Sequence, residues 1–282
     1  MVPWLRNRLG RSTTHVHILY PSSPLRAKQP DEQFAAEVEA VRAAGFEVSL
    51  FSLEDFQSGT FRAFPSLPRN TEILYRGWML SATEYGAFVS ALTEAGARLA
   101  IDLRAYLSNH YLPNWYPSLA ELTPETHVYR PNSDLEAELR ALGWSEFFIK
   151  DYVKSLKTSV GSRITKADQV AAVVADMLRF RGVIEGGFCV RRVESFLSDT
   201  ERRYFVLDGM CYAESGEVPP IVHECARRHR SRFYSVDIVR RADEQLRVVE
   251  VGDGQVSDLV GWTPARFASI LAEAFRDETR VA

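Results

Sequence analysis

The 282-residue sequence predicts a small α/β layer with parallel strands, followed by a larger α+β part. Two strand–helix–strand patterns fill the first hundred residues, and this alternation is typical of a parallel sheet covered by helices. The later part of the chain is rich in short apolar runs that read as strands. Between the two parts, residues 106–134 contain four prolines and several aromatic residues. We expect this stretch to be a surface connector, with a domain boundary near residue 110.

In the N-terminal part, apolar spacing and breakers set the expected elements. Phe34, Val38 and Val41 lie at i, i+4 and i+7, which is the spacing of a helix face directed toward a core. Asp31 is placed to begin this helix, and Gly45 to end it. The expected strands are 15–20, 46–51, 73–76 and 98–101, and a second helix begins at Thr83.

The C-terminal part contains three further helical patterns and five strand patterns. Residues 135–142 predict a short helix closed by Gly143. The other expected helices are 167–180 and 264–275, and the expected strands are 146–152, 187–193, 203–207, 233–241 and 246–251. Mixed patterns of this kind are typical of two or three lobes around one site.

Composition excludes several classes of protein. The hydrophobic fraction of 46% and charged fraction of 25% are those of a globular protein, not of a disordered, collagenous or coiled-coil one. The formal net charge of −3 shows no overall footprint for nucleic acid or an anionic membrane. Three cysteines without a close pair argue against a disulfide framework and for a reducing cytoplasm. We also expect no membrane span and no secretory signal.

The segment 147–162 combines an apolar strand with a loop rich in Lys, Ser and Gly. Phosphate binding needs positive charge and converging backbone N–H groups, and such a loop after a strand supplies both. The segment is not a Walker A loop, because it lacks GxxxxGK[ST]. A solvated basic turn is the alternative. The candidate residues are Lys150, Lys154, Lys157, Ser159, Gly161 and Ser162.

Near the C-terminus, carboxylates lie on two neighbouring predicted strands. Asp237 and Glu250 belong to a hairpin, whose geometry can place both side chains on one face. Asp253 and Gln255 follow at once in a loop. Hard oxygen ligands of this kind suit Mg²⁺ that also contacts substrate phosphates. Apolar neighbours on both strands argue against two solvated acids at a strand edge.

Two pairs of adjacent arginines flank the segment between the strands 187–193 and 203–207. Alternation directs Arg191 and Arg192 to opposite faces, so one of them is free to contact an anion. The same holds for Arg202 and Arg203. Arg76 ends a predicted strand of the first sheet, where ligands bind in open α/β sheets, but a structural ion pair is an equal alternative for it.

In this order, these pieces resemble the ATP-grasp superfamily, and most closely its clade named for one arginine and two lysines. The resemblance spans residues 70–262 and is most specific in FFIKDYVKS, EGGFCVRRVESF with ERRYFVLDG, and SVDI with VVEVGDGQVS. It implies a small pre-ATP-grasp lobe over residues 1–110 and an ATP-grasp domain with two subdomains over 111–282. It also implies an ATP-dependent carboxylate–amine ligase that works through an acyl phosphate with ATP and Mg²⁺. Its substrates would be small-molecule or peptide carboxylates and amines.

The resemblance implies a role for each matching residue. The arginine and two lysines of the clade correspond to Arg76, Lys150 and either Lys154 or Lys157. Ser159, Gly161 and Ser162 resemble the mobile loop that covers phosphates. Arg192, Val193 and Glu194 fall where the hinge meets adenine and ribose. Arg203 resembles an arginine on the phosphate side, and Asp237, Glu250 and Asp253 resemble the magnesium-binding acids.

Two departures from the family pattern keep alternatives open. Many ATP-grasp enzymes carry Glu-x-Asn at the second metal position, whereas this chain has Glu250, Val251 and Gly252. A lysine that is usual near the connector is missing, because residues 105–125 contain none. A phosphotransferase that uses the same nucleotide site, or a nucleotide-binding module without catalysis, are therefore the alternative functions.

Overall fold

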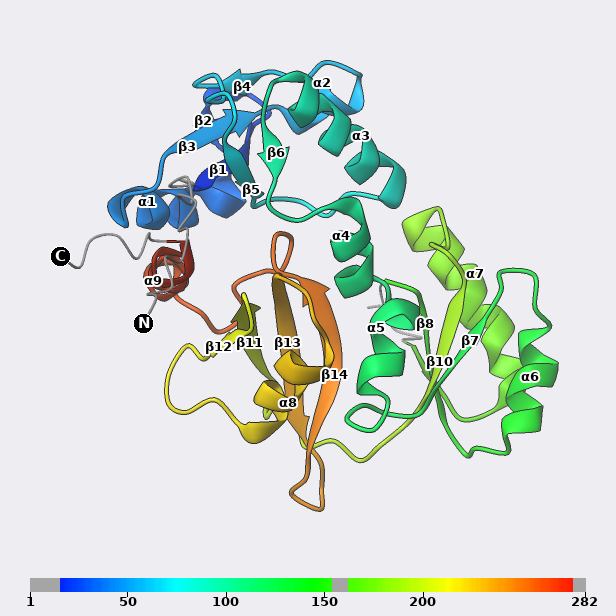
Figure 1. Ribbon diagram of the computed structural model, residues 1–282. Coiled ribbons are helices and arrows are strands. Elements are labelled where there is room, and N and C mark those ends of the chain that lie inside the picture. The colour runs from blue at the N-terminus through cyan, green and yellow to red at the C-terminus, as the bar shows by residue number, and fades with distance from the viewer. Residues whose placement is uncertain (1–15, 154–161, 276–282) are drawn as a thin grey trace, which may run out of the picture. The chain divides into compact units, whose positions relative to one another are not determined.

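The computed structural model describes residues 16–153 and 162–275 (Figure 1). The chain divides into two compact units, one of residues 1–100 with 264–282 and the other of residues 101–263. Within the described residues, no helix is both long enough and apolar enough to cross a bilayer.

The first unit is a largely parallel sheet with helices, which confirms the predicted α/β layer. Its strands run in the order β4-β3-β1-β5-β6, and β1 pairs in parallel with β3 and β5. Strand β2 adds antiparallel to β1. The elements are β1 (Val16–Ser23), β2 (Arg26–Pro30), α1 (Ala35–Ala43), β3 (Val48–Phe51), α2 (Leu53–Gln57), β4 (Ala63–Phe64), β5 (Glu72–Tyr75), α3 (Ala82–Glu94), β6 (Arg98–Leu99) and α9 (Pro264–Phe275).

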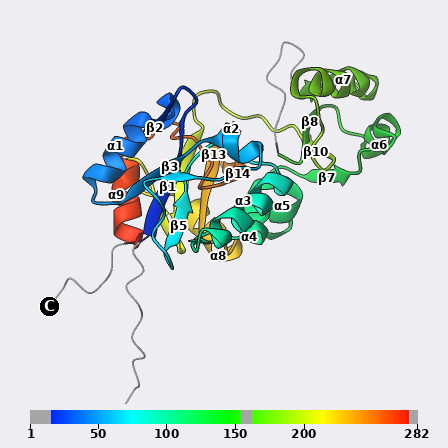
Figure 2. The same cartoon turned by 90° about the horizontal axis from the view of Figure 1, so that it is seen from above.

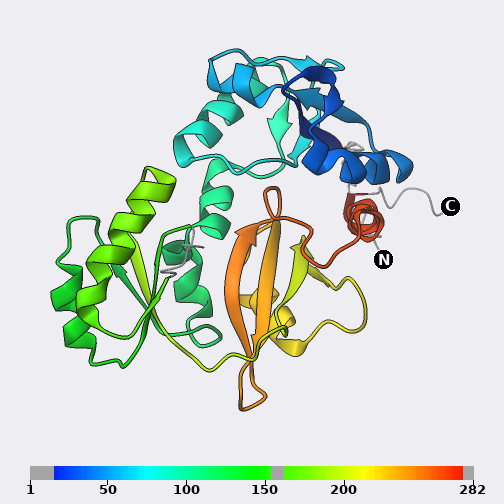
Figure 3. The ribbon, with the colours of Figure 1, turned by 180° about the vertical axis from the view of Figure 1, so that it is seen from behind.

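Local sequence explains the helices of this unit. The predicted stripe on α1 is buried, with Val38 and Val41 fully covered. Helix α3 begins with a capping box in which Ser81 and Glu84 satisfy each other's backbone N–H groups. Helix α9 packs against α1, as the views from above and behind show (Figures 2 and 3). The C-terminal helix therefore belongs to the first unit, although it follows the second in sequence.

The second unit contains two antiparallel sheets, in the orders β7-β10-β8-β9 and β12-β11-β13-β14. Its strands are β7 (Thr126–Tyr129), β8 (Phe147–Asp151), β9 (Arg163–Ile164), β10 (Phe188–Arg192), β11 (Arg202–Leu207), β12 (Met210–Tyr212), β13 (Phe233–Arg240) and β14 (Leu246–Asp253). Its helices are α4 (Leu103–His110), α5 (Leu112–Leu119), α6 (Leu135–Leu142), α7 (Val170–Arg181) and α8 (Pro220–Arg228). Residues 193–201 connect β10 of one sheet to β11 of the other, and we call them the hinge.

Each sheet of the second unit has its own core. Ile149 of β8 packs with Leu139 of α6 and with Val173 and Met177 of α7. In Figure 2, α6 and α7 lie together beside β7, β8 and β10. The second core joins residues of α5, α8, β13 and β14, including Trp115, which is 1% exposed.

The expectation of a surface connector at 106–134 was wrong. These residues form most of α4, all of α5 and strand β7. Asp102 caps α4, and a proline in the first turn of α5 is compatible with a helix because that turn has no N–H bonds to lose. Pro113 lies in this first turn, whereas Pro117 lies inside α5, where a proline removes one helical hydrogen bond without ending the helix. The prediction treated every proline as a breaker.

Of the aromatic residues in the stretch 106–134, Tyr106 and Trp115 are buried core side chains, whereas Tyr111, Tyr116 and Tyr129 are half-buried. Helices α2 and α8 and the short strands β2, β4, β9 and β12 were also not predicted.

Candidate active site

Four charged side chains of the second unit lie in one continuous row. Arg203 of β11 pairs in register with Asp237 of β13, and Asp237 pairs in register with Glu250 of β14. Lys150 of β8, in the other sheet, reaches Glu250 from the far side, with Nζ to Oε1 at 3.3 Å. The order of charges is positive, negative, negative, positive, and the row is neutral as a whole.

Arg203 holds Asp237 in a two-point hydrogen bond. Its Nε donates to Oδ1 at 2.7 Å and its Nη2 to Oδ2 at 2.6 Å. Its Nη1 also donates to the carbonyl of Asp258 in the loop after β14. The side chains of Asp237 and Arg203 are 6% and 14% exposed, so the pair is shielded from water. A planar guanidinium that donates two parallel hydrogen bonds to a carboxylate can donate the same two bonds to a phosphate.

The two carboxylates differ in acidity. Burial raises the pKa of Asp237, and the nearby Glu250 adds to this, so that together they outweigh the stabilising effect of Arg203. Burial also acts to raise the pKa of Glu250, but Lys150 and the two nearby arginines outweigh it and lower that pKa. Two carboxylates on facing positions repel each other unless cations lie beside them. The two carboxylates can therefore bind a further cation in addition to the cationic side chains of Arg203 and Lys150.

A β-bulge next to Glu250 shapes this part of the site. Asp237 faces Glu250, but the next residue, Ile238, faces Val248, so Val249 is the extra residue on β14. A bulge leaves the extra residue without its ladder partner and redirects neighbouring side chains. Here Arg191 donates from Nη1 to the carbonyl of Val249 at 2.6 Å. The bulge is thus held from outside the hairpin, directly beside Glu250.

Lys150 is positioned by its strand and by the turn that follows. Its side chain is 7% exposed. The next residue, Asp151, is fully buried and accepts hydrogen bonds from the backbone N–H groups of Val153 and Glu185 at 2.8 and 3.2 Å. Cys189 lies opposite Lys150 in the ladder, and burial raises the pKa of its thiol to about 12. This thiol is therefore protonated at neutral pH and does not act as a nucleophile.

The donor set fits magnesium that is shared with a nucleotide. Within the described residues, no group of three or more His, Cys, Asp and Glu side chains is arranged to hold a metal ion. Asp237 and Glu250 alone supply hard oxygen ligands here, and Mg²⁺ commonly takes one or two carboxylates and completes its shell with phosphate oxygens and water. We therefore find the residues compatible with the metal that the resemblance implies.

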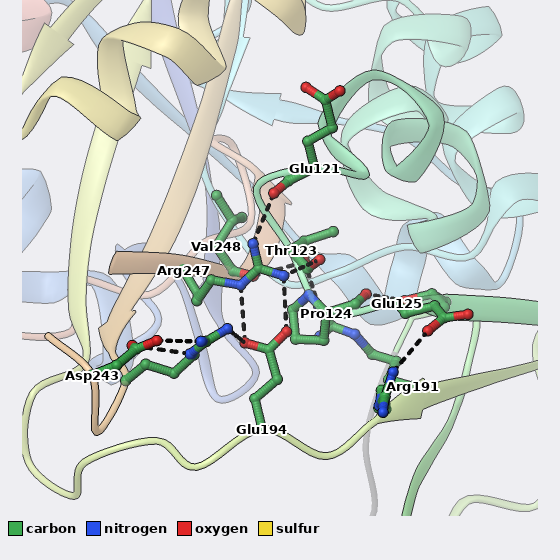
Figure 4. A network of polar contacts seen from close by, with 12 residues as sticks. Glu121, Thr123, Pro124, Glu125, Arg191, Glu194, Asp243, Arg247 and Val248 are labelled. Carbon is green, nitrogen blue, oxygen red and sulfur yellow. Dashed lines mark hydrogen bonds and ion pairs between the residues drawn. The ribbon is translucent and has the colours of Figure 1, made fainter. Parts of the chain in front are cut away.

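The hinge carries the predicted Val193 and Glu194, and Arg192 ends the strand before it. Glu194 accepts hydrogen bonds from Arg247 on both oxygens, from Nη2 at 2.8 Å and from Nε at 2.9 Å. Arg241 approaches the same carboxylate at 3.4 Å. Figure 4 shows Arg247 directed between Glu194 and the segment that contains Glu121 and Thr123.

The adjacent arginines point in opposite directions, as alternation predicts. Arg191 is 6% exposed and turned inward, whereas the side chain of Arg192 is 59% exposed and lies near Glu125 at 3.5 Å. Burial lowers the pKa of Arg191 to about 10, so it remains charged at neutral pH. Arg191 meets protein oxygens of Thr123 and of β14, so it is not available to an anion from solution.

Asp253 does not join the two other predicted metal ligands. It is three residues after Glu250 on β14, and alternation turns it to the opposite face of the strand. There it is fully buried and accepts from Asn109 at 2.8 Å and from Gln255 at 2.9 Å. Asn109 in turn accepts from His229 at 2.9 Å. Asp253 and Gln255 thus hold the loop after β14 in a buried polar network.

Arg76 belongs to the first unit and forms the ion pair that was its alternative interpretation. It is 1% exposed, and its Nε and Nη2 each donate to Glu37 at 2.7 Å. Glu37 also accepts from the hydroxyl of Tyr20 at 2.8 Å, and the guanidinium lies 4.6 Å from the ring of Phe267. This geometry favours a structural role over substrate contact.

Several predicted residues lie outside the described part of the chain. They are Lys154, Lys157, Ser159 and Gly161. Ser162, the next residue along, is 4% exposed, and its carbonyl accepts from the backbone N–H of Ile149 at 2.7 Å.

Sequence reasoning missed Thr123, Asn109 and Arg247 as parts of the site. Thr123 and Asn109 fall in the stretch that was predicted to be a connector. Arg247 lies in a strand that was predicted from its apolar residues alone. One available signal was Arg247 in a largely apolar strand, since a buried arginine needs a partner such as the hinge acid Glu194.

Residues 136–271 match a family model of the ATP-grasp domain, the third family of the clade named for one arginine and two lysines. The crystal structure of D-cycloserine synthetase DcsG is 16% identical with a TM-score of 0.62, covering 93% of this chain and 99% of that chain. The ATP-grasp ligase PsnB, complexed with precursor peptide PsnA2 and AMPPNP, is 15% identical with a TM-score of 0.58, covering 95% and 99%. D-alanyl-alanine synthetase A from Vibrio cholerae is 13% identical with a TM-score of 0.58, covering 94% and 98%. This likeness shows the ATP-grasp fold alone, and none of the curated proteins that were compared matches the chain.

Proposed function

Residues 136–271 are an ATP-grasp domain of the clade named for one arginine and two lysines, and on that basis we propose that the protein is an ATP-dependent carboxylate–amine ligase. The observation that carries the proposal is the row of Arg203, Asp237, Glu250 and Lys150. It offers two cations for phosphate oxygens and two carboxylates for magnesium, and of these four side chains Lys150, Arg203 and Asp237 are largely shielded whereas Glu250 is 46% exposed. The three proteins of similar fold described above, a D-cycloserine synthetase, an ATP-grasp ligase complexed with a precursor peptide and a D-alanyl-alanine synthetase, are in keeping with this proposal.

The reaction follows from these roles. An oxygen of the substrate carboxylate attacks the γ-phosphorus of ATP, the bond to the β,γ-bridging oxygen breaks, and ADP leaves. The product is an acyl phosphate. An amine then attacks the carbonyl carbon, inorganic phosphate leaves, and the amine loses a proton, which completes an amide. No nucleophilic side chain is needed in either step.

Each residue of the row has a part in this chemistry. Lys150 and Arg203 leave their carboxylate partners for phosphate oxygens and offset the charge that builds up during transfer. Asp237 and Glu250 would hold Mg²⁺, and the metal would supply Lewis-acid neutralisation of phosphate charge. With Mg-ATP bound, these four side chains would exchange their internal ion pairs for contacts with the nucleotide and its metal. The backbone of Val193 in the hinge faces the base in this proposal.

Trapping of the acyl phosphate tests the proposal. The purified chain is incubated with Mg-ATP, hydroxylamine and single members of a panel of amino acids and dipeptides. A ligase yields a hydroxamate together with equimolar ADP and phosphate for at least one member. A stable phosphorylated hydroxyl compound would instead indicate a phosphotransferase. Binding of Mg-AMPPNP in calorimetry without turnover across the panel would favour the non-catalytic module.

A matched pair of variants connects the outcome to the row. Lys150→Ala removes a cation of the row, whereas Lys166→Ala removes an exposed lysine near the start of α7. Under the proposal, hydroxamate formation falls by about a hundredfold or more in the first variant and is unchanged in the second. Equal activity in both would contradict the role of Lys150.

A further inference from the structure

Thr123 is the meeting point of two arginines that hold different parts of the proposed nucleotide site. It is fully buried and lies between α5 and β7. Its hydroxyl accepts from Nη2 of Arg191 at 2.5 Å and donates to the carbonyl of Val248 at 2.7 Å. Its carbonyl accepts from Nη2 of Arg247 at 2.7 Å. We call Thr123, Arg191, Glu194 and Arg247 the Thr123 clamp.

One arm of the clamp ends at the hinge. The guanidinium of Arg247 uses Nε and Nη2 on Glu194 and Nη1 on the carbonyl of Glu121 at 2.8 Å. The side chains of Arg247 and Glu194 are 15% and 14% exposed. A charged, two-point hydrogen bond at this exposure holds its partners in one geometry. Both oxygens of Glu194 are therefore engaged by protein and not directed to a ligand.

The other arm ends beside the metal-binding acid. Arg191 donates to the carbonyl of Val249, the extra residue of the β-bulge, and Val249 is bonded directly to Glu250. Strand β14 is an edge strand, and the segment around Thr123 covers that edge, since the N–H of Val248 also donates to the carbonyl of Leu122 at 2.8 Å. The position of Glu250 thus depends on the same segment that holds the hinge.

We propose that Thr123 is a positioning residue that sets the spacing between the hinge and Glu250, through Arg247 and Glu194 on one side and Arg191 on the other. The proposal rests on the proposed function, because a nucleoside triphosphate would span these two points with its base at the hinge and its phosphates at the acid. It differs from the role that the resemblance implied for Glu194, which was contact with adenine or ribose. Here Glu194 acts through Arg247.

The test uses two substitutions of Thr123 that separate the contribution of its hydroxyl from that of its methyl group. Thr123→Val keeps the shape of the side chain and removes its hydroxyl, whereas Thr123→Ser keeps the hydroxyl and removes a methyl group. In the full-length chain without nucleotide, we expect amide hydrogen exchange of residues 248–251 to be about tenfold faster in Thr123→Val than in the wild type, because the lost hydroxyl contacts Arg191 and the carbonyl of Val248. Exchange of residues 193–197 should rise less, because the carbonyl of Thr123 still accepts from Arg247. Thr123→Ser should restore most of the protection.

Nucleotide binding supplies the second measurement. For Mg-AMPPNP, we expect Thr123→Val and Glu194→Gln each to raise Kd about tenfold, and the double variant to be no weaker than the weaker single variant, because both break one clamp. In turnover, KM for ATP should rise more than kcat falls. Arg240→Lys, on an exposed pair with Glu244 in the same hairpin, is the control and should match the wild type.

Two results would overturn the proposal. The first is unchanged amide exchange in Thr123→Val. The second is a Glu194→Gln variant that weakens nucleotide binding without faster exchange at 193–197, which would make Glu194 a direct ligand. If the wild type binds no Mg-AMPPNP, the proposed function fails, and the exchange experiment alone then decides whether the clamp fixes these segments. If Thr123→Val does not fold, Glu194→Gln, which is nearly isosteric, replaces it in both measurements.

Discussion

Asp237 lies directly opposite Glu250 in the β13–β14 ladder, and each of them is paired with a different cation. The two carboxylates are thus adjacent to each other but satisfied separately, Asp237 by Arg203 and Glu250 by Lys150. In such an arrangement the two cationic side chains stabilise the neighbouring acids in the absence of a metal. The same acids are then able to bind a metal, and the same cations to bind phosphates.

Asp237→Asn should therefore abolish most metal-dependent turnover while keeping the fold. The amide retains an acceptor for Arg203 but loses the negative charge that magnesium requires. We expect ATP turnover to fall about a hundredfold or more, with only partial recovery at high Mg²⁺. The measurement is ADP release against Mg²⁺ concentration. Asp243→Asn, in the exposed hairpin turn, is the matched control, and a similar loss in both variants would argue against a metal at Asp237.

Gly252→Asn tests whether the Glu-x-Asn pattern of many ATP-grasp enzymes can be restored. A Cβ atom at Gly252 would lie 2.9 Å from the hydroxyl oxygen of Ser257 and 3.1 Å from that of Ser235. These two hydroxyls are buried and 2.8 Å apart, so they fill the space that an Asn side chain needs. We expect the variant to lose about 1–3 kcal/mol in the free energy of unfolding and to bind Mg-AMPPNP more weakly.

The same position offers an internal control. Ser257→Ala removes the nearer of the two crowding oxygens but also its hydrogen bond to the carbonyl of Asp253, so the relevant quantity is the coupling: Gly252→Ala should cost less in the Ser257→Ala background than in the wild type. Urea unfolding measures both. Tighter Mg-AMPPNP binding in Gly252→Asn than in the wild type would show that the space is open and that the interpretation from the hydroxyl pair is incorrect.

Most strands of four or more residues were predictable because alternation and breakers are local signals, whereas their registers were not predicted. Asp237 and Glu250 could be placed on facing strands from their hairpin alone, and Lys150 from its apolar strand. The face of Asp253 was missed, because one residue of register decides whether a side chain meets the row or the core. The clamp at Thr123 was not predictable, since it joins residues 68 and 124 positions apart, and several of its contacts are to backbone carbonyls. Nothing in local pattern marks such contacts.

Arg76→Lys distinguishes a structural from a catalytic role for this buried arginine. Lysine keeps the charge but loses the two parallel hydrogen bonds to Glu37. We expect a loss of about 1.5–3 kcal/mol in the free energy of unfolding, as for the loss of a hydrogen bond to a charged group, while the Kd for Mg-AMPPNP stays near that of the wild type. Arg42→Lys, on the exposed side of α1, is the control. A large loss of turnover with unchanged stability would instead support the contact with substrate that the resemblance implies.

His229 should make the protein sensitive to mild acid. It is 5% exposed, and burial lowers its pKa from the ordinary 6.5 to about 4. Between these two values the unfolded chain binds a proton that the folded chain does not, so the free energy of unfolding falls as pH falls through this window, by up to about 3 kcal/mol. His229→Gln keeps a donor for the Oδ1 of Asn109 but does not titrate, so we expect urea unfolding of this variant to change less between about pH 7 and about pH 4.5. His223→Gln, exposed on the same helix α8, should retain the full dependence of the wild type, and equal pH dependence in the two variants would exclude His229 as the source.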